Sequence, residues 1–343
     1  MSTHILKKID IKSILSVGLD VSKSKIDVCI LLSNENEKDI CLQIANSKKW
    51  ITDFISLLKE NNCSKKVPFI IESTGDYNTL ACLLFSETWF NIKEINPIIT
   101  RNYVKHTIRW TKTDKTDAKA LAGIGLQNRD ELFTFNKSKK FIEINKKVSL
   151  VSNLETQLQS LKRTLHSFDE IFSELELEVS WSIKDIQLSI QELEEKIKKF
   201  QQEIQDTSIW EDADKKVEII NSITGVSKYM AQVFYASFAH KDFTSKESMY
   251  AFVGYDPKLK DSGTFVGKAC ISKRWNAYVR KKLFQSAFCA VQHSKIFKDI
   301  YEKHKQRWKH HFVCVIAVVK KMIYIMFSLL KNNSRFNPNF GIL

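Results

Sequence analysis

The stretch SVGLDVSKSKIDVCILL, residues 16–32, decides the fold of the N-terminal part of the chain. It holds two β-rich runs, 16–22 and 25–33, separated by a polar turn, and a third such run follows at 39–46. Short β-rich runs joined by polar turns predict a three-stranded meander. Asp20 closes the apolar part of the first run, so we expect its carboxylate at the end of a central, buried strand.

Outward from this stretch, helical and β-rich patterns alternate. A helix is predicted at about 48–60, a strand at 67–72, a helix at 77–86 and a strand at 91–97. This order resembles the ribonuclease H-like fold, in which the first strand carries one acid and a later strand beside it carries a second. The second acid would be Glu72, which ends the run VPFIIE.

Two further acids, Asp114 and Asp117, stand three residues apart in KTDKTDA at the start of a predicted helix. An isolated Asp or Glu is usually a solvated surface charge, since acids are seldom buried unless paired. Here the fold could gather Asp20, Glu72, Asp114 and Asp117 at one point. Carboxylates gathered in this way hold hard cations against phosphate, so the sequence predicts a Mg²⁺ site in which Mn²⁺ could substitute.

The charge of the chain favours a polyanionic partner. Lys and Arg number 53 against 39 Asp and Glu, a net charge of +14 over 343 residues. Residues 241–331 hold 19 basic and 6 acidic residues, an excess of +13, whereas residues 167–205 hold 4 and 10, a balance of −6. The positive field therefore belongs to the C-terminal third, where it would attract nucleic acid.

Neither cysteine spacing nor hydropathy indicates an exported or membrane protein. The seven cysteines lack metal-ligand spacing and mostly lie in apolar runs, as expected of thiols in the reducing cytoplasm. Residues 1–13 lack the apolar core of a secretion signal. The run FVCVIAVVKKMIYIMFSLL, 312–330, carries Lys320 and Lys321 at its centre. We therefore expect a buried helix there and no membrane partner.

From about 141 to 205 the pattern changes to long helices. Apolar residues repeat with spacings of three and four in both halves, as in a coiled coil. Two antiparallel helices of one chain, or a seam between subunits, would satisfy this pattern equally. The repeating residues are Val148, Val151, Leu154, Leu158, Leu161 and Leu165, followed by Ile183, Ile186, Ile190, Leu193, Ile197, Phe200 and Ile204.

The basic C-terminal region contains two motifs of interest. A turn at Gly225, in IINSITGVSKYM, resembles a helix-hairpin-helix element that can hold a DNA phosphate. Ser262, in DSGTFVGKACISKR, is followed by Gly263 and flanked by lysines. A Ser-Gly pair is most often a turn. A serine acts as a nucleophile only where other groups take its proton and stabilise the developing charge, which metal ions held by the four acids could do.

Seven blocks then carry a resemblance over nearly the whole chain: 17–31, 70–77, INP at 95–97, 112–118, ITGV at 223–226, 251–268 and ISKRWN at 271–276. Together they resemble the DEDD transposases of bacterial insertion sequences, bridge-RNA-guided recombinases related to the Piv DNA invertase. The resemblance implies an α/β plus α architecture. A RuvC-like domain would span 1–136, a coiled-coil linker 137–209, and a mostly helical transposase domain 210–343.

The resemblance also implies roles. Asp20, Glu72, Asp114 and Asp117 would bind the metal, and Ser262 would attack a DNA phosphate to give a covalent 5′-phosphoserine. A structured guide RNA would choose the DNA sites, and a tetramer, a dimer of dimers, would bring the serine of one subunit to the acids of another. We expect these basic residues to hold DNA or RNA: Arg101, Lys105, Arg109, Lys112, Lys115, Lys268, Lys273, Arg274, Arg280, Lys281 and Lys282.

Two other functions use the same residues. A RuvC-like endonuclease would cut DNA with a metal-activated water, and Ser262 would then have no task. A nucleic-acid-binding protein without catalysis would retain the four acids as structure only.

Overall fold

The computed structural model describes residues 14–33, 39–60, 63–73, 75, 77–88, 90–105, 114–127, 134–135, 138–175, 181–239, 241, 243–258, 261–262, 265–266, 270–273 and 276–338. They form two compact units, residues 1–139 and 140–343. Each unit is described by itself.

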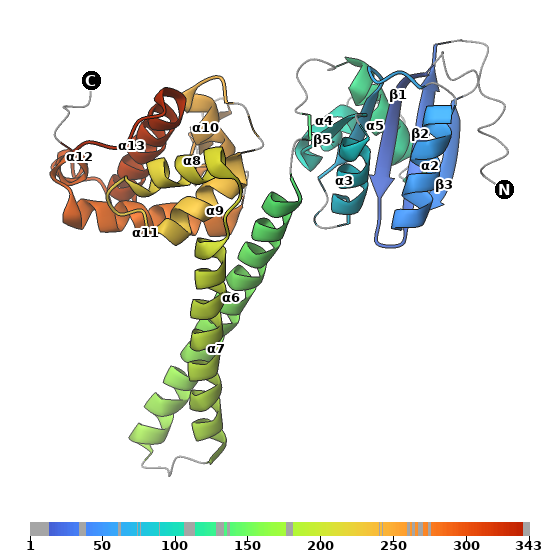
Figure 1. Ribbon diagram of the computed structural model, residues 1–343. Helices are drawn as coiled ribbons and strands as arrows, with labels where there is room; N and C mark the ends of the chain where they lie inside the picture. Colours follow the sequence, from blue (N-terminus) through green and yellow to red (C-terminus); the bar gives the residue numbers. More distant parts are fainter. Residues whose placement is uncertain are drawn as a thin grey trace. The chain divides into compact units, whose positions relative to one another are not determined.

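The first unit is a five-stranded mixed sheet with helices (Figure 1). The strands lie in the order β3-β2-β1-β4-β5, with antiparallel pairing between β1, β2 and β3 and parallel pairing of β1 with β4 and of β4 with β5. This confirms the predicted meander and the predicted pairing of the fourth strand beside the first. The strands are β1 (Ile14–Val21), β2 (Lys25–Leu32), β3 (Ile40–Ala45), β4 (Pro68–Glu72) and β5 (Asn91–Ile95).

The two faces of this sheet are covered by different helices. On one face the ring of Phe69 on β4 lies 5.1 Å from that of Phe85, and the Phe85 ring lies 6.3 Å from that of Phe54. On the other face Ile70 packs with Leu121 and Ile124. The covering helices are α2 (Lys48–Glu60) and α3 (Thr79–Glu87) on the Phe69 side, and α5 (Asp114–Gln127) with α4 (Pro97–Lys105) beside it on the Ile70 side.

The second unit begins with a long antiparallel hairpin of α6 (Lys139–Glu174) and α7 (Trp181–Asp206), which run side by side in Figure 1. The predicted apolar stripes face each other, and Leu158, Ile190 and Ile197 share one core. Lys162 pairs with Glu194, and the Nε2 atom of Gln201 donates to Glu155 at 3.2 Å. The apolar repeat was compatible with an intramolecular hairpin or with a seam between subunits, and the helices of one chain already satisfy it as a hairpin.

The remaining helices of the second unit share the core of the hairpin. The short strands pair as two hairpin ladders, β6 with β9 and β7 with β8. The elements are α8 (Glu211–Asn221), α9 (Lys228–Phe238), α10 (Lys246–Val253), β6 (Pro257–Lys258), β7 (Asp261–Ser262), β8 (Phe265–Val266), β9 (Cys270–Ile271), α11 (Ala277–His293), α12 (Lys295–Lys305) and α13 (His311–Asn332).

Helix α13 is the predicted apolar helix. Among the described residues it alone is long and apolar enough to cross a membrane. Its apolar side, including Val315, Val318, Met322 and Met326, is buried in the core, and the helix packs on α10, α11 and α12. The prediction of a buried core helix is confirmed.

Candidate active site

The register of the sheet sets Asp20 beside Glu72. Leu19 on β1 pairs with Ile71 on the parallel strand β4, so the next residues along both strands are neighbours at the same sheet edge. Side chains of a strand alternate between faces. Asp20 therefore shares the face of Gly18, and Glu72 that of Ile70, which is the face covered by α5.

Helix α5 reaches this edge because Gly18 lets it approach. A Cβ atom built on Gly18 would overlap the carbonyl oxygen of Ala118 and lie 2.5 Å from the backbone nitrogen of Ala122. The helix backbone therefore lies directly on β1. Asp117 precedes Ala118, and Asp114 is the first residue of the helix. The fold thus brings the start of α5, with both of its acids, to the end of β1.

The pKa of Asp20 records this convergence. Burial raises the pKa of its carboxyl from 3.8 to about 6, with further increases from the negative charges of Asp117, Asp114, Asp27 and Glu72, in that order. Like charges nearby and loss of solvent both disfavour ionisation. The other three acids of the predicted tetrad therefore lie within electrostatic reach of Asp20.

Asp27 is a fifth acid at this site, which the sequence analysis missed. It lies opposite Asp20 in the antiparallel ladder of β1 and β2, and only 5% of its surface is exposed. Its carboxylate accepts a hydrogen bond from Gln43 Nε2 at 2.8 Å and forms an ion pair with Lys25 Nζ at 3.2 Å. The signal for it was a single acid inside the otherwise apolar run IDVCILL, and only the strand register places this acid beside Asp20.

Lys25 supplies positive charge to the cluster. Its Nζ atom lies 2.6 Å from Oδ2 of Asp114, and hydrogen bonding to Asp114 and then Asp27 raises the pKa of the lysine. The same hydrogen bond lowers the pKa of Asp114. Within the described part of the chain, no three acidic, histidine or cysteine side chains converge closely enough to hold an ion as they stand.

The donor chemistry nevertheless fits a hard divalent cation. Oxygen ligands from several carboxylates suit Mg²⁺ and Mn²⁺. After burial, the negative charges of the neighbouring acids also raise the pKa of Asp20, so a cation bound there would favour its ionised form. Of the residues described, Asp20, Glu72, Asp114 and Asp117 are the ones that could hold such a cation, and Asp27 lies opposite Asp20 on β2.

Ser262 belongs to the second unit. It ends the short strand β7 and pairs with Phe265 of β8. This short hairpin lies between β6 and β9, whose register pairs Lys258 with Cys270. The structure describes only the backbone of Ser262.

The predicted basic residues meet different environments. Arg101, on α4, and Lys273 are exposed, whereas Lys105 and Lys115 are described by their backbone only. Lys281 is about half exposed. Arg109, Lys112, Lys268 and Arg274 lie outside the described residues.

Arg280 and Lys282 are engaged inside the second unit. Lys282 is 8% exposed, its Nζ atom lies 2.8 Å from Oε1 of Glu155, and it stands over the ring of Tyr278 at 5.1 Å. Burial lowers the pKa of Arg280, whose backbone carbonyl accepts from the hydroxyl of Tyr255 at 2.8 Å. Lys282 is thus a core ion-pair partner of Glu155, which argues against its predicted contact with nucleic acid.

Comparison with known proteins covers both units. Residues 17–172 match a family model described as a transposase, the DEDD type of IS110, and residues 217–302 match the transposase IS116/IS110/IS902 family. The pilin gene-inverting proteins of Moraxella bovis and Moraxella lacunata are each 22% identical over 334 residues, 94% of this chain and 97% of each relative.

An uncharacterised protein of insertion element IS116 from Streptomyces clavuligerus is 23% identical over 147 residues, which are 43% of this chain and 36% of that protein. The first match includes Asp20, Glu72, Asp114 and Asp117, and the second includes Ser262. DEDD enzymes of this kind generally use a divalent metal ion. The chain belongs to the IS110/IS116 family of DEDD transposases, enzymes that cut and rejoin DNA.

Proposed function

We propose that this transposase cuts and rejoins DNA through a covalent phosphoserine, with Asp20, Glu72, Asp114 and Asp117 holding Mg²⁺ and with Ser262 as the nucleophile. The observation that carries the proposal is that Asp117, Asp114 and Glu72 lie within electrostatic reach of Asp20, whose pKa is raised to about 6 by burial first and then by these acids and Asp27. When bound, the cation would neutralise charge on the phosphate and lower the pKa of the attacking hydroxyl.

The reaction is a pair of transesterifications. The Oγ atom of Ser262 attacks a DNA phosphorus and loses its proton, a P–O bond forms, and the bond to the 3′ oxygen breaks. That oxygen takes up a proton and becomes a free 3′-hydroxyl. A 3′-hydroxyl of the partner strand then attacks the phosphoserine and releases the serine. Each step makes one phosphodiester bond and breaks another, so no nucleotide cofactor is required.

Trapping the adduct tests this mechanism. Full-length protein is incubated with Mg²⁺ and DNA labelled next to the cut, and the protein is denatured and examined for bound label. Wild-type protein should carry label that phosphodiesterase removes, and Ser262→Ala should carry none. Cleavage without an adduct in wild type, or cleavage that survives in Ser262→Ala, would favour the RuvC-like endonuclease, which uses the same acids and water.

A matched pair of substitutions tests the acids. Asp20→Asn should abolish cleavage, whereas Asp53→Asn, an exposed acid of α2, should leave it intact. Equal activity of Asp20→Asn and wild type would support a protein in which the acids are structural. Chelation by EDTA should stop the reaction, and Mg²⁺ or Mn²⁺ should restore it.

We further propose that a structured guide RNA selects the DNA sites. The support is the basic residues of the C-terminal third, such as the exposed Lys273, whose contacts to a phosphate backbone would be blind to sequence. Sequencing the RNA that co-purifies with the protein would identify the guide. Site-specific activity that persists after complete ribonuclease treatment would contradict this part of the proposal.

Finally, we propose a tetramer in which Ser262 of one subunit works with the acids of another. The apolar side chains left exposed near the end of α6 support an interface there, namely Phe168 at 44% and Ile171 at 50% on the helix and Leu175 at 63% just after it. Mixing inactive Asp20→Asn and Ser262→Ala proteins tests the shared site. Recovered activity in the mixture is expected, whereas inactivity of every mixture, with subunit exchange verified, would place both groups in one subunit's site.

A further inference from the structure

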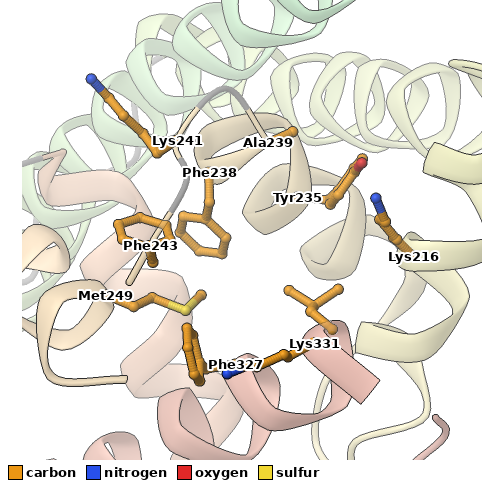
Figure 2. A pocket seen from close by; sticks show the side chains of 10 residues that line it. Lys216, Tyr235, Phe238, Ala239, Lys241, Phe243, Met249, Phe327 and Lys331 are labelled. Carbon is orange, nitrogen blue, oxygen red and sulfur yellow. The ribbon is translucent and has the colours of Figure 1, made fainter. Parts of the chain in front are cut away.

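A cavity of about 320 Å³ lies in the second unit, between α8, α9, α10 and α13 (Figure 2). Its volume is at the lower end of the range for small-molecule sites, about 300–1,000 Å³. All of its lining residues belong to one compact unit. None of the proposed catalytic residues lines it.

The inner wall of the cavity is apolar and aromatic. Phe238 and Met249 are almost fully buried, at 4% and 1% exposure. Phe243 and Phe327 are half-buried, so part of each ring is accessible from the cavity. Figure 2 shows these four side chains gathered on one side of the opening. A flat, apolar group could therefore lie among the rings.

The rim of the cavity is positive. Lys216, Lys241 and Lys331 line it, and the residues that line it include no acid. Lys216 is paired with Asp212 at 2.8 Å outside the cavity, and Lys241 stands 6.0 Å from the ring of Phe252. In Figure 2 the amine of Lys241 is directed away from the centre of the cavity. It could therefore contact a negatively charged group of a ligand at the rim.

Tyr235 adds a polar group to the opposite wall. Burial raises the pKa of its hydroxyl, which keeps the phenol neutral and able to donate or accept a hydrogen bond at neutral pH. In Figure 2 its hydroxyl lies near the amine of Lys216. The cavity thus combines ring surface, one neutral hydroxyl and three amines.

We propose that this cavity binds an unstacked base of a single-stranded nucleic acid, with the flanking phosphates held by Lys216, Lys241 and Lys331. A base offers a flat face to Phe243 and Phe327 and polar edge atoms to Tyr235, and its backbone carries the negative charge that the rim would attract. An apolar peptide would bring no negative charge to this positive rim. The proposal rests on the action of this protein on nucleic acid.

Photocrosslinking tests the location directly. Full-length protein is bound to single-stranded DNA, and in a second arm to RNA of the same sequence, each with 5-iodouracil at one position and a fluorescent label. Mass spectrometry of the crosslinked peptides should find Tyr235, Phe243 or Phe327. The arm with the higher yield identifies whether DNA or RNA supplies the base.

Binding by variants is measured with the same labelled strands. Phe243→Ala should weaken binding by at least about fivefold, the lower end of what loss of one base stack produces. Lys331→Glu should weaken it and reduce its salt dependence. Lys298→Glu, an exposed lysine of α12, is the matched charge control and should have the smaller effect. An abasic residue in place of the crosslinking base should weaken wild-type binding without any change to the protein.

The outcomes separate the cavity from the proposed function. If wild-type protein binds no nucleic acid, both fail. If wild type binds, but the crosslinks lie elsewhere or the abasic strand and Phe243→Ala bind like their controls, the cavity holds no base. If Lys331→Glu and Lys298→Glu lose the same amount of binding affinity, Lys331 acts only as general surface charge, and the role proposed for the rim is wrong.

Discussion

The Nζ atom of Lys25 lies 2.6 Å from Oδ2 of Asp114, so a cation carried by β2 is bound to the first carboxylate of α5. Lys25 also contacts Asp27 at 3.2 Å. A lysine in this position stabilises a cluster of acids when no metal is bound. It also competes for Asp114 with any metal that enters.

The first prediction follows from this competition. Lys25→Met should raise the affinity for Mn²⁺ by about two- to fivefold, the worth of a partly exposed ion pair. Titration of the metal-free protein with Mn²⁺, followed by electron paramagnetic resonance, measures it. Lys23→Met, which removes an exposed lysine of the neighbouring turn, is the control for net charge. An unchanged or lower affinity in Lys25→Met would mean that Lys25 does not compete for the site.

The second prediction concerns Asp20 without metal. Its folded pKa, about 6, exceeds the ordinary value of 3.8, so its ionised form destabilises the fold. That penalty is absent below pH 3.8 and grows as the pH rises through about 6. In EDTA at pH 7, Asp20→Asn should therefore raise the free energy of unfolding by about 1 kcal/mol, discounted for partial exposure.

Urea denaturation at pH 7 and pH 4 checks the sign. The gain in Asp20→Asn should shrink at pH 4, where the wild-type carboxyl is largely protonated, and Asp53→Asn should show no such pattern. A loss of stability in Asp20→Asn at pH 7 would mean that the ionised carboxylate is well compensated without metal.

The third prediction concerns the approach of α5 to β1. Gly18→Ala should cost about 1–3 kcal/mol, because the added methyl overlaps the helix backbone, and it should abolish DNA cleavage by moving Asp114 and Asp117 away from Asp20. Denaturation and cleavage assays measure the two effects. At Gly75 a Cβ atom would meet nothing within 4 Å, although its φ of +77° is strained for alanine. Gly75→Ala should therefore cost about 1 kcal/mol and retain cleavage. Full cleavage by Gly18→Ala would show that the acids need no close helix contact.

The positions of the proposed metal ligands on their elements could be predicted, because the local sequence indicates each of these elements. Asp20 and Glu72 end apolar runs, and Asp114 and Asp117 begin a helix, so each could be placed on its element before the elements were assembled. Asp27 and Lys25 could not be recognised in this way. Their proximity to the acids depends on the register of β2 against β1 and on the docking of α5, which are contacts between distant residues.

Charge near a motif was a poorer guide than register or burial. Lys282 lies in the basic run that follows Ser262, yet the helical periodicity of α11 turns it into the core, where Glu155 of α6 meets it. The residues of one helix that face the core share a 3.6-residue period with apolar positions, and a lysine among them needs a buried acid. No local pattern identifies that acid 127 positions earlier in the chain.

The last prediction separates structure from nucleic-acid binding at Lys282. Burial alone would raise the pKa of Glu155, but hydrogen bonds and charge from Lys282 and Lys281 outweigh it and lower the pKa. Lys282→Met should therefore reduce the free energy of unfolding by about 1–2 kcal/mol, because Glu155 loses its buried partner. Chemical denaturation at neutral pH measures this loss. Lys281→Met, which removes the more exposed partner, should cost less than about 1 kcal/mol.

The pH dependence and the binding affinity complete the test. Because the folded pKa of Glu155 is lowered, the stability it contributes is present above the ordinary value of 4.5 and is lost as the pH falls through the folded value. The difference between wild type and Lys282→Met should shrink over the same range. Folded Lys282→Met should bind labelled nucleic acid as wild type does, since the ammonium it lacks was held by Glu155 and Tyr278. Weaker nucleic-acid binding at unchanged stability would instead show that Lys282 contacts nucleic acid, as the sequence analysis predicted.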